Sequence, residues 1–144
     1  MAKTVIIGGV AGGASCAARL RRLDETREIV MLERGPYISY ANCGLPYHVG
    51  GVIPERESLI VQTPEILHER FNLDIRIEHE ATAIDRAGKT VTVRELASGR
   101  EYQESYDTLV IATGSSPVRP PIPGIDSPRI KTIWSVQTRT RSRN

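Results

Sequence analysis

A glycine-rich turn near the N-terminus constrains this chain more than any other feature. Residues 4–7, TVII, have the composition of a buried parallel strand. GGVAGG follows, and then residues 14–25, ASCAARLRRLDE, which are good helix formers without a proline. A strand, a tight turn and a helix in this order bring backbone N–H groups and the positive end of a helix to a pyrophosphate. We therefore predict an α/β fold organised around this turn.

The second apolar stretch, EIVMLERG, ends in an acid at the spacing of a ribose-binding residue. Glu33 follows the last glycine of the turn by about 20 residues, the separation expected in dinucleotide-binding domains. Gly8 and Gly13 fit the pattern G-x-G-x-x-G, but Val10 occupies its middle position. Such glycines also occur where a turn and a helix simply pack closely. The strand, the helix and Glu33 together favour a dinucleotide site.

Short strands and turns are predicted for the second half of the chain. Residues 73–93 alternate apolar and polar side chains around a turn at residues 87–88, and a further turn is expected at residues 98–99. An apolar strand then runs directly into Thr113 and Gly114. That glycine either lets the backbone approach a ligand or forms an ordinary turn. Residues 117–128, PVRPPIPGIDSP, are predicted to form an extended connector.

Composition and charge exclude several classes of partner. The 144 residues are 40% hydrophobic and 25% charged, which suits one soluble domain. The aliphatic runs are too short to span a bilayer and no leader is apparent, so we expect a cytoplasmic protein without a membrane partner. The net charge is +2, but the charges are unevenly distributed along the chain, because five basic residues and no acid follow Asp126. The basic end lacks an aromatic platform, so no nucleic-acid partner is predicted.

The two cysteines, Cys16 and Cys43, do not form a disulfide framework. Cys16 lies in the predicted helix among alanines and is expected to be a small packed side chain. Cys43 lies in SYANCGLPYHVGG, where Ser39, Asn42 and backbone N–H groups can donate hydrogen bonds to a thiolate. From these residues alone, a reactive thiol and an ordinary loop cysteine are about equally plausible.

Three segments in this order, VIIGGVAGGASCAARLRRLDE with Glu33, SYANCGLPYHVGG and LVIATGSSP, resemble the FAD-dependent pyridine nucleotide-disulfide oxidoreductases. The resemblance covers residues 3 to about 136 and is greatest to the single-cysteine branch, which contains coenzyme A-disulfide reductases and NADH oxidases. It implies an incomplete, Rossmann-like, three-layer FAD-binding domain in which a parallel sheet and helices are joined by a small antiparallel β-meander. The implied divisions are residues 1–118 for the FAD-binding segment, 119–128 for the connector, and 129–144 for the start of an NAD(P)H domain with a basic tail.

The resemblance also implies a set of cofactor-binding residues. The turn and the start of the helix would face the FAD pyrophosphate, Glu33 would hold the adenosine ribose, and the backbone of residues 81–83 would approach the adenine. The full implied set is Gly8, Gly9, Val10, Ala11, Gly12, Gly13, Glu33, Arg34, Asn42, Thr82, Ala83, Ala112, Thr113 and Gly114.

By the same resemblance, Cys43 would be the catalytic thiol beside the flavin, assisted by Asn42. Branches with paired cysteines have their second cysteine where this chain has His48, so Cys43 would act alone. The expected substrate is a small-molecule disulfide such as coenzyme A disulfide. An NADH oxidase or peroxidase would instead cycle Cys43 through a sulfenic acid. No metal site is predicted.

Three residues are implied as substrate contacts: Ser39, Arg19 and Arg22. The two arginines would meet coenzyme A phosphates, although solvated helix charges are at least as plausible an interpretation.

Intact members of this family are homodimers of several hundred residues that take NAD(P)H as co-substrate. We expect this chain alone to be inactive, and an inert nucleotide-binding remnant is an alternative. After Val136, QTRTRSRN departs from the family. With CGN-type arginine codons, a reading frame that takes one nucleotide from upstream can encode Pro-Asp-Thr-Asp-Ala-Ile, so we predict a frameshift after Val136. A genuine basic tail and a trimmed domain remain alternatives.

Overall fold

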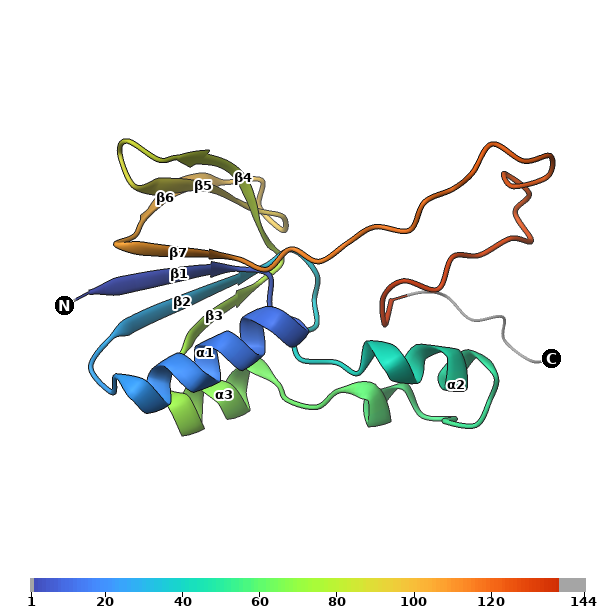
Figure 1. Cartoon of the computed structure of the whole chain (residues 1–144), viewed down its shortest axis with the longest axis horizontal. Helices are drawn as coiled ribbons and strands as arrows, with labels where there is room; N and C mark the ends of the chain where they lie inside the picture. The colour runs from blue at the N-terminus through green and yellow to red at the C-terminus, as the bar shows by residue number, and fades with distance from the viewer. Residues whose placement is uncertain (1, 138–144) are drawn as a thin grey trace.

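The computed structural model describes residues 2–137 and has three layers, as predicted (Figure 1). The middle layer is a parallel sheet in the order β3-β2-β1-β7. Its strands are β1 (Lys3–Ile7), β2 (Glu28–Glu33), β3 (Asp74–Ile77) and β7 (Thr108–Ile111). Helices α1 (Ala11–Leu23) and α3 (Pro64–Phe71) cover one face. The other face is covered by the antiparallel meander β4 (His79–Asp85), β5 (Thr90–Glu95) and β6 (Glu101–Ser105).

The central strands are apolar at consecutive positions because both faces of the parallel sheet are buried. Alternate residues of β1 and β2 pack against the helices: Ile6, Ile29 and Met31. The intervening residues pack against the meander: Val5, Ile7, Val30 and Leu32. Val91 and Val93 of β5 complete this second cluster. The sheet therefore forms the core of the domain.

Helix α1 begins three residues before the predicted stretch, since it includes Gly12 and Gly13. It ends at Leu23, where the Asp24 carboxylate accepts hydrogen bonds from the backbone N–H groups of Thr26 and Arg27. The buried guanidinium of Arg21 donates to the carbonyl oxygens of Phe71 and Asn72. This side chain therefore joins α1 to the C-terminal end of α3.

The sequence prediction missed every helical segment between β2 and β3. These segments are η1 (Asn42–Gly44), α2 (Leu45–Val49), η2 (Arg56–Leu59) and α3. The N-terminus of α3 does carry a recognisable signal: Thr63 is the N-cap and accepts a hydrogen bond from the N–H of Ile66, and Pro64 is the first helical residue. The helix could thus have been predicted from its cap.

After β7, the described chain up to residue 137 contains turns but no helix or strand. It extends away from the sheet and returns toward α2 (Figure 1). The Trp134 indole N–H donates to the carbonyl oxygen of Ser115, and Val136 is buried with Leu45 and Leu59. The tail in which a frameshift is predicted lies, apart from Gln137, outside the described residues, and the predicted domain divisions stay predictions. No described helix combines the length and the hydrophobicity that crossing a bilayer requires.

Candidate functional site

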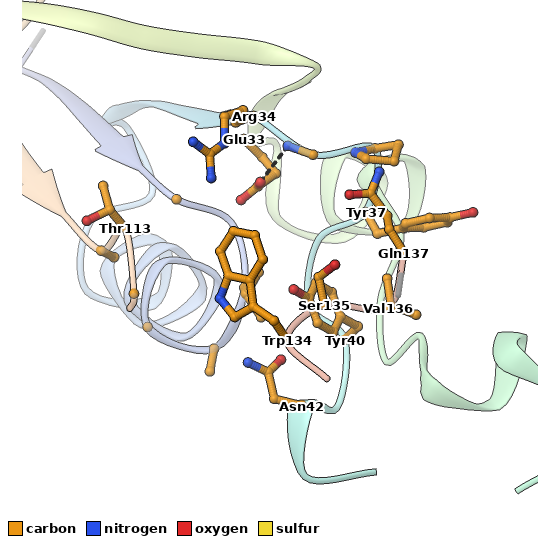
Figure 2. A pocket seen from close by; sticks show the side chains of 18 of the residues that line it. Glu33, Arg34, Tyr37, Tyr40, Asn42, Thr113, Trp134, Ser135, Val136 and Gln137 are labelled. Atoms are coloured by element: carbon orange, nitrogen blue, oxygen red, sulfur yellow. Dashed lines mark hydrogen bonds between the residues drawn. The ribbon is translucent and has the colours of Figure 1, made fainter. Parts of the chain in front are cut away.

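A cleft of about 620 Å³ opens where the carboxyl ends of β1, β2 and β7 meet. Ligands of open α/β sheets bind at this edge. Ten of the predicted cofactor residues line the cleft: Gly8, Val10, Ala11, Gly12, Glu33, Arg34, Asn42, Ala112, Thr113 and Gly114. Segments far apart in the sequence are thus brought together around one cavity (Figure 2).

Two glycines of the turn are required by the backbone around them. Gly8 has a φ of +101°, and a side chain there would meet the carbonyl oxygen of Ala112 at 2.2 Å. A side chain on Gly13 would lie 1.7 Å from the carbonyl oxygen of Gly8. These glycines therefore bring α1 and the end of β7 against the turn. Gly13 is buried in this contact and does not itself line the cleft.

The N-terminus of α1 opens into the cleft. Val10 is the N-cap, and no side chain of the described residues caps this end by a hydrogen bond. Free N–H groups and the positive end of the helix dipole favour an anion here. Val10, Ala11 and Gly12 all line the cavity, so a phosphate group can approach the helix end directly. The arrangement fits the pyrophosphate of a dinucleotide.

Glu33 lies at the end of β2, on the rim of the cleft. One carboxylate oxygen accepts a hydrogen bond from the N–H of Gly9 at 2.8 Å. The other accepts from the N–H of Gly35 at 2.7 Å, the bond drawn as a dashed line in Figure 2. These bonds fix the carboxylate without using all of its acceptor positions. Gly9 therefore orients Glu33 rather than lining the cavity. The acid remains available to two hydroxyl groups of a ribose.

The pKa of Tyr40 is affected by the Glu33 carboxylate. Burial raises the pKa of its phenol, and the negative charge of Glu33 raises it further. The side chain lines the cleft and packs beside the cluster that contains Leu45. Tyr40 was not predicted as a site residue, because an aromatic residue in a loop carries no distinctive signal.

A second cavity of about 290 Å³ adjoins the cleft and shares Gly8, Glu33 and Arg34 with it. It extends over Ala81 and over Glu80, whose carboxylate lies 3.7 Å from the Arg34 guanidinium. Of the segment predicted to approach an adenine, only Ala81 reaches this cavity. Thr82 and Ala83 are exposed and line neither cavity.

Cys43 lies in the short 3-10 turn η1, next to the cleft. Its side chain is exposed, whereas Cys16 is partly buried against the core beneath α1, as predicted. Asn42 lines the cleft, but Cys43 does not. The N–H of Ala41 donates to the carbonyl oxygen of Leu59, and the N–H of Gly44 donates to that of Ala41. The thiol is therefore open to solvent on a turn with few backbone contacts.

The predicted substrate residues are not gathered at one point. Ser39 has a φ of 46° and its N–H donates to the carbonyl oxygen of Gly9, so it joins the cysteine segment to the glycine turn. Arg19 and Arg22 are exposed on α1, and the guanidinium of Arg22 donates to the carbonyl oxygen of Ala18. Neither arginine lines either cavity.

Residues 134–137 form part of the cleft wall and were not predicted as site residues. The sequence places them beyond the proline-rich connector, with no local pattern that points back to the sheet. Trp134 lines both cavities, and Figure 2 shows its indole projecting into the larger one. Only the tertiary structure brings this segment to the site.

The family model for "Pyridine nucleotide-disulphide oxidoreductase" matches residues 2–144. The chain belongs to this family. A coenzyme A disulfide reductase from Staphylococcus aureus is 40% identical over 116 residues, which cover 81% of this chain and 26% of that relative. The chain therefore spans about a quarter of the length of the curated relatives it matches.

Solved structures agree with this assignment. Reduced CoADR-RHD from Bacillus anthracis is 56% identical with a TM-score of 0.82, covering 85% of this chain and 22% of that one. The water-forming NADH oxidase from Lactobacillus brevis, bound to NADH, is 32% identical with a TM-score of 0.85, covering 94% of this chain and 30% of that one. The prediction that this chain is a fragment of a member of this family is confirmed.

Proposed function

We propose that this chain is the FAD-holding segment of an NAD(P)H-dependent disulfide oxidoreductase whose thiol Cys43 reduces coenzyme A disulfide or a related small-molecule disulfide. The observation that carries the proposal is the cleft itself. It combines an open helix N-terminus, the oriented Glu33 carboxylate and the backbone of residues 112–114, and Cys43 lies beside it. The similarity to a coenzyme A disulfide reductase supports the choice of substrate.

The adenosine diphosphate half of FAD has a matching group for each of its parts in this proposal. The N–H groups at the start of α1 bind the pyrophosphate, and Glu33 accepts hydrogen bonds from the ribose. The smaller cavity over Ala81, walled by Arg34, receives the adenine. The flavin supplies the two electrons that NAD(P)H delivers in the intact enzyme. Of the predicted adenine contacts, Thr82 and Ala83 act at most through the position of β4.

The thiol chemistry follows from the exposed position of Cys43. Its thiolate attacks one sulfur of the disulfide, so that a mixed disulfide forms and one coenzyme A thiolate leaves. Two electrons, which bound flavin would supply, then cleave the mixed disulfide into the Cys43 thiolate and the second coenzyme A thiolate, which takes a proton from solvent. Asn42, which lines the cleft beside Cys43, is placed to hydrogen-bond the substrate or the cofactor.

A retention experiment tests whether the chain holds FAD. The purified protein is equilibrated with FAD and dialysed, and bound flavin is measured by absorbance. Glu33→Gln should weaken binding by about 1.5 to 3 kcal/mol, the range for hydrogen bonds to a charged group. Glu28→Gln is the matched control, because it changes an exposed acid at the opposite end of the same strand. No FAD binding, or equal affinities of the two variants, would contradict the proposal.

The match to an NADH oxidase supports a second candidate, in which peroxide oxidises Cys43 to a sulfenic acid. Mass spectrometry separates the two. Coenzyme A disulfide should add one coenzyme A to Cys43 under the disulfide proposal. A sulfenic acid trapped by dimedone after stoichiometric peroxide, without any reaction with the disulfide, would favour the oxidase.

A further inference from the structure

Residues 134–137 line the proposed cofactor cleft, and they also pack against residues next to the turn that carries Cys43. Trp134 lines both cavities, and its indole N–H donates to the carbonyl oxygen of Ser115 at 2.6 Å. Two residues later, Val136 is only 3% exposed. Its side chain shares one buried cluster with Leu45 and Leu59. The whole segment lines the cleft, and Val136 also joins it to the cluster of Leu45 and Leu59.

Leu59 connects this cluster to the cysteine turn. Its carbonyl oxygen accepts a hydrogen bond of 2.8 Å from the N–H of Ala41, two residues before Cys43. On the other side of the cysteine, a side chain on Gly44 would meet Cδ2 of Leu59 at 2.5 Å, so the turn and Leu59 are in close contact. A shift of Leu59 must therefore move the backbone on both sides of Cys43.

Two large apolar side chains of the connector before this segment project into solvent. Val118 is 88% exposed and Ile122 is 56% exposed. Two anchors of residues 134–137 are the hydrogen bond of Trp134 to Ser115 and the burial of Val136 in its cluster. A ligand that packs against Trp134 acts directly on one of these two anchors.

We propose that residues 134–137 are a strap that couples occupancy of the cofactor cleft to the conformation of the Cys43 turn, with Val136 as the positioning residue. A flavin nucleotide in the cleft packs against Trp134, holds Val136 in its cluster and so orders the turn through Leu59. The coupling to FAD rests on the proposed function, whereas the anchoring by Val136 does not.

The first experiment uses the full chain without any nucleotide. Hydrogen exchange of the Ala41 and Gly44 amides, which are both hydrogen-bonded, reports the order of the turn. Val136→Ser should accelerate their exchange about tenfold by favouring local opening. Exchange at these two amides should stay as slow as in the parent when Val136 is replaced by isoleucine (Val136→Ile) and when the exposed Val118 is replaced by serine (Val118→Ser). The Gly8 amide, bonded to the carbonyl oxygen of Leu32, should keep its rate in every variant. Unchanged exchange at Ala41 and Gly44 in Val136→Ser would overturn the proposal.

The second experiment adds saturating FAD and again measures hydrogen exchange of the Ala41 and Gly44 amides. FAD should slow this exchange at least about threefold in the parent, because opening of the turn is suppressed. Because Val136 also lines the cleft, the FAD concentration is raised until Val136→Ser is saturated, and this variant should still show little of the protection. Equal protection in both proteins overturns the coupling. Absence of FAD binding refutes both the proposed function and the coupling. The anchoring by Val136 is tested separately, by the experiment without nucleotide.

Discussion

On one side of the cleft, the glycine turn rests on a sheet whose central residues, such as Val5 and Val30, are fully buried. On the other side, the turn that carries Cys43 rests on a cluster of three buried residues, Leu45, Leu59 and Val136. The glycine-turn side, where a nucleotide is proposed to bind, is therefore a product of the fold as a whole. The thiol side depends on a few contacts, one of which comes from far along the chain.

The largest effect on stability is expected from a substitution on the glycine-turn side. Gly13→Ala places a carbon 1.7 Å from the Gly8 carbonyl oxygen, so α1 must move away from the turn. We expect the free energy of unfolding to fall by about 3 kcal/mol or more, as measured by urea denaturation.

Gly12→Ala is the matched control for this substitution. Its new methyl group would lie 3.5 Å from Cβ of Ala112, an ordinary contact. The helix should gain up to about 1 kcal/mol from the loss of a glycine. Similar stabilities of the two variants would contradict the role assigned to Gly13.

A pair of leucine truncations sharpens the comparison. Leu32 and Leu59 are both 1% exposed. Leu32→Ala should cost about 2 to 5 kcal/mol of global stability, because it opens a cavity in the core of the domain. Leu59 lies in a small cluster that can collapse around a shorter side chain, so Leu59→Ala should lower the free energy of unfolding by about 2 kcal/mol or less. Only Leu59→Ala should accelerate amide exchange at Gly44 under native conditions. The reverse pattern would show that the two sides are not independent.

The smallest effect concerns Tyr40, which lies between the two sides. Burial, and then the Glu33 charge, raise its pKa in the folded state. The protonated phenol therefore contributes stability that is fully present below pH 10, the ordinary pKa, and is lost as pH rises through the folded value. Tyr40→Phe should weaken the loss of stability above about pH 10. In ultraviolet titrations, Glu33→Gln should lower the pKa of Tyr40, and an unchanged titration would contradict the assigned coupling.

The sequence predicted the fold of the glycine-turn side well because its determinants are local. Nucleotide binding by this side stays a prediction. TVII, the glycines and Glu33 lie within one β-α-β unit, where apolar runs and turn chemistry fix the geometry. The prediction that the domain is an α/β sheet with an antiparallel meander is confirmed for the same reason.

The remainder depended on contacts that local patterns do not encode. Tyr40 and Trp134 join the cleft only through tertiary packing, and Val136 is buried by residues of a distant loop. Arg19 and Arg22 show the opposite case, since they were predicted near substrate yet lie outside both cavities. Their role in binding coenzyme A phosphates stays a prediction.

Fluorescence of Trp134, the only tryptophan of the sequence, tests most directly whether FAD occupies this cleft. The indole lines both cavities, so bound flavin should quench it. We predict saturable quenching at one FAD per chain, reversal by excess ADP, and a shift to higher FAD concentration in Glu33→Gln. Retention of FAD without any change in Trp134 emission, or quenching that rises linearly without saturation, would contradict the account.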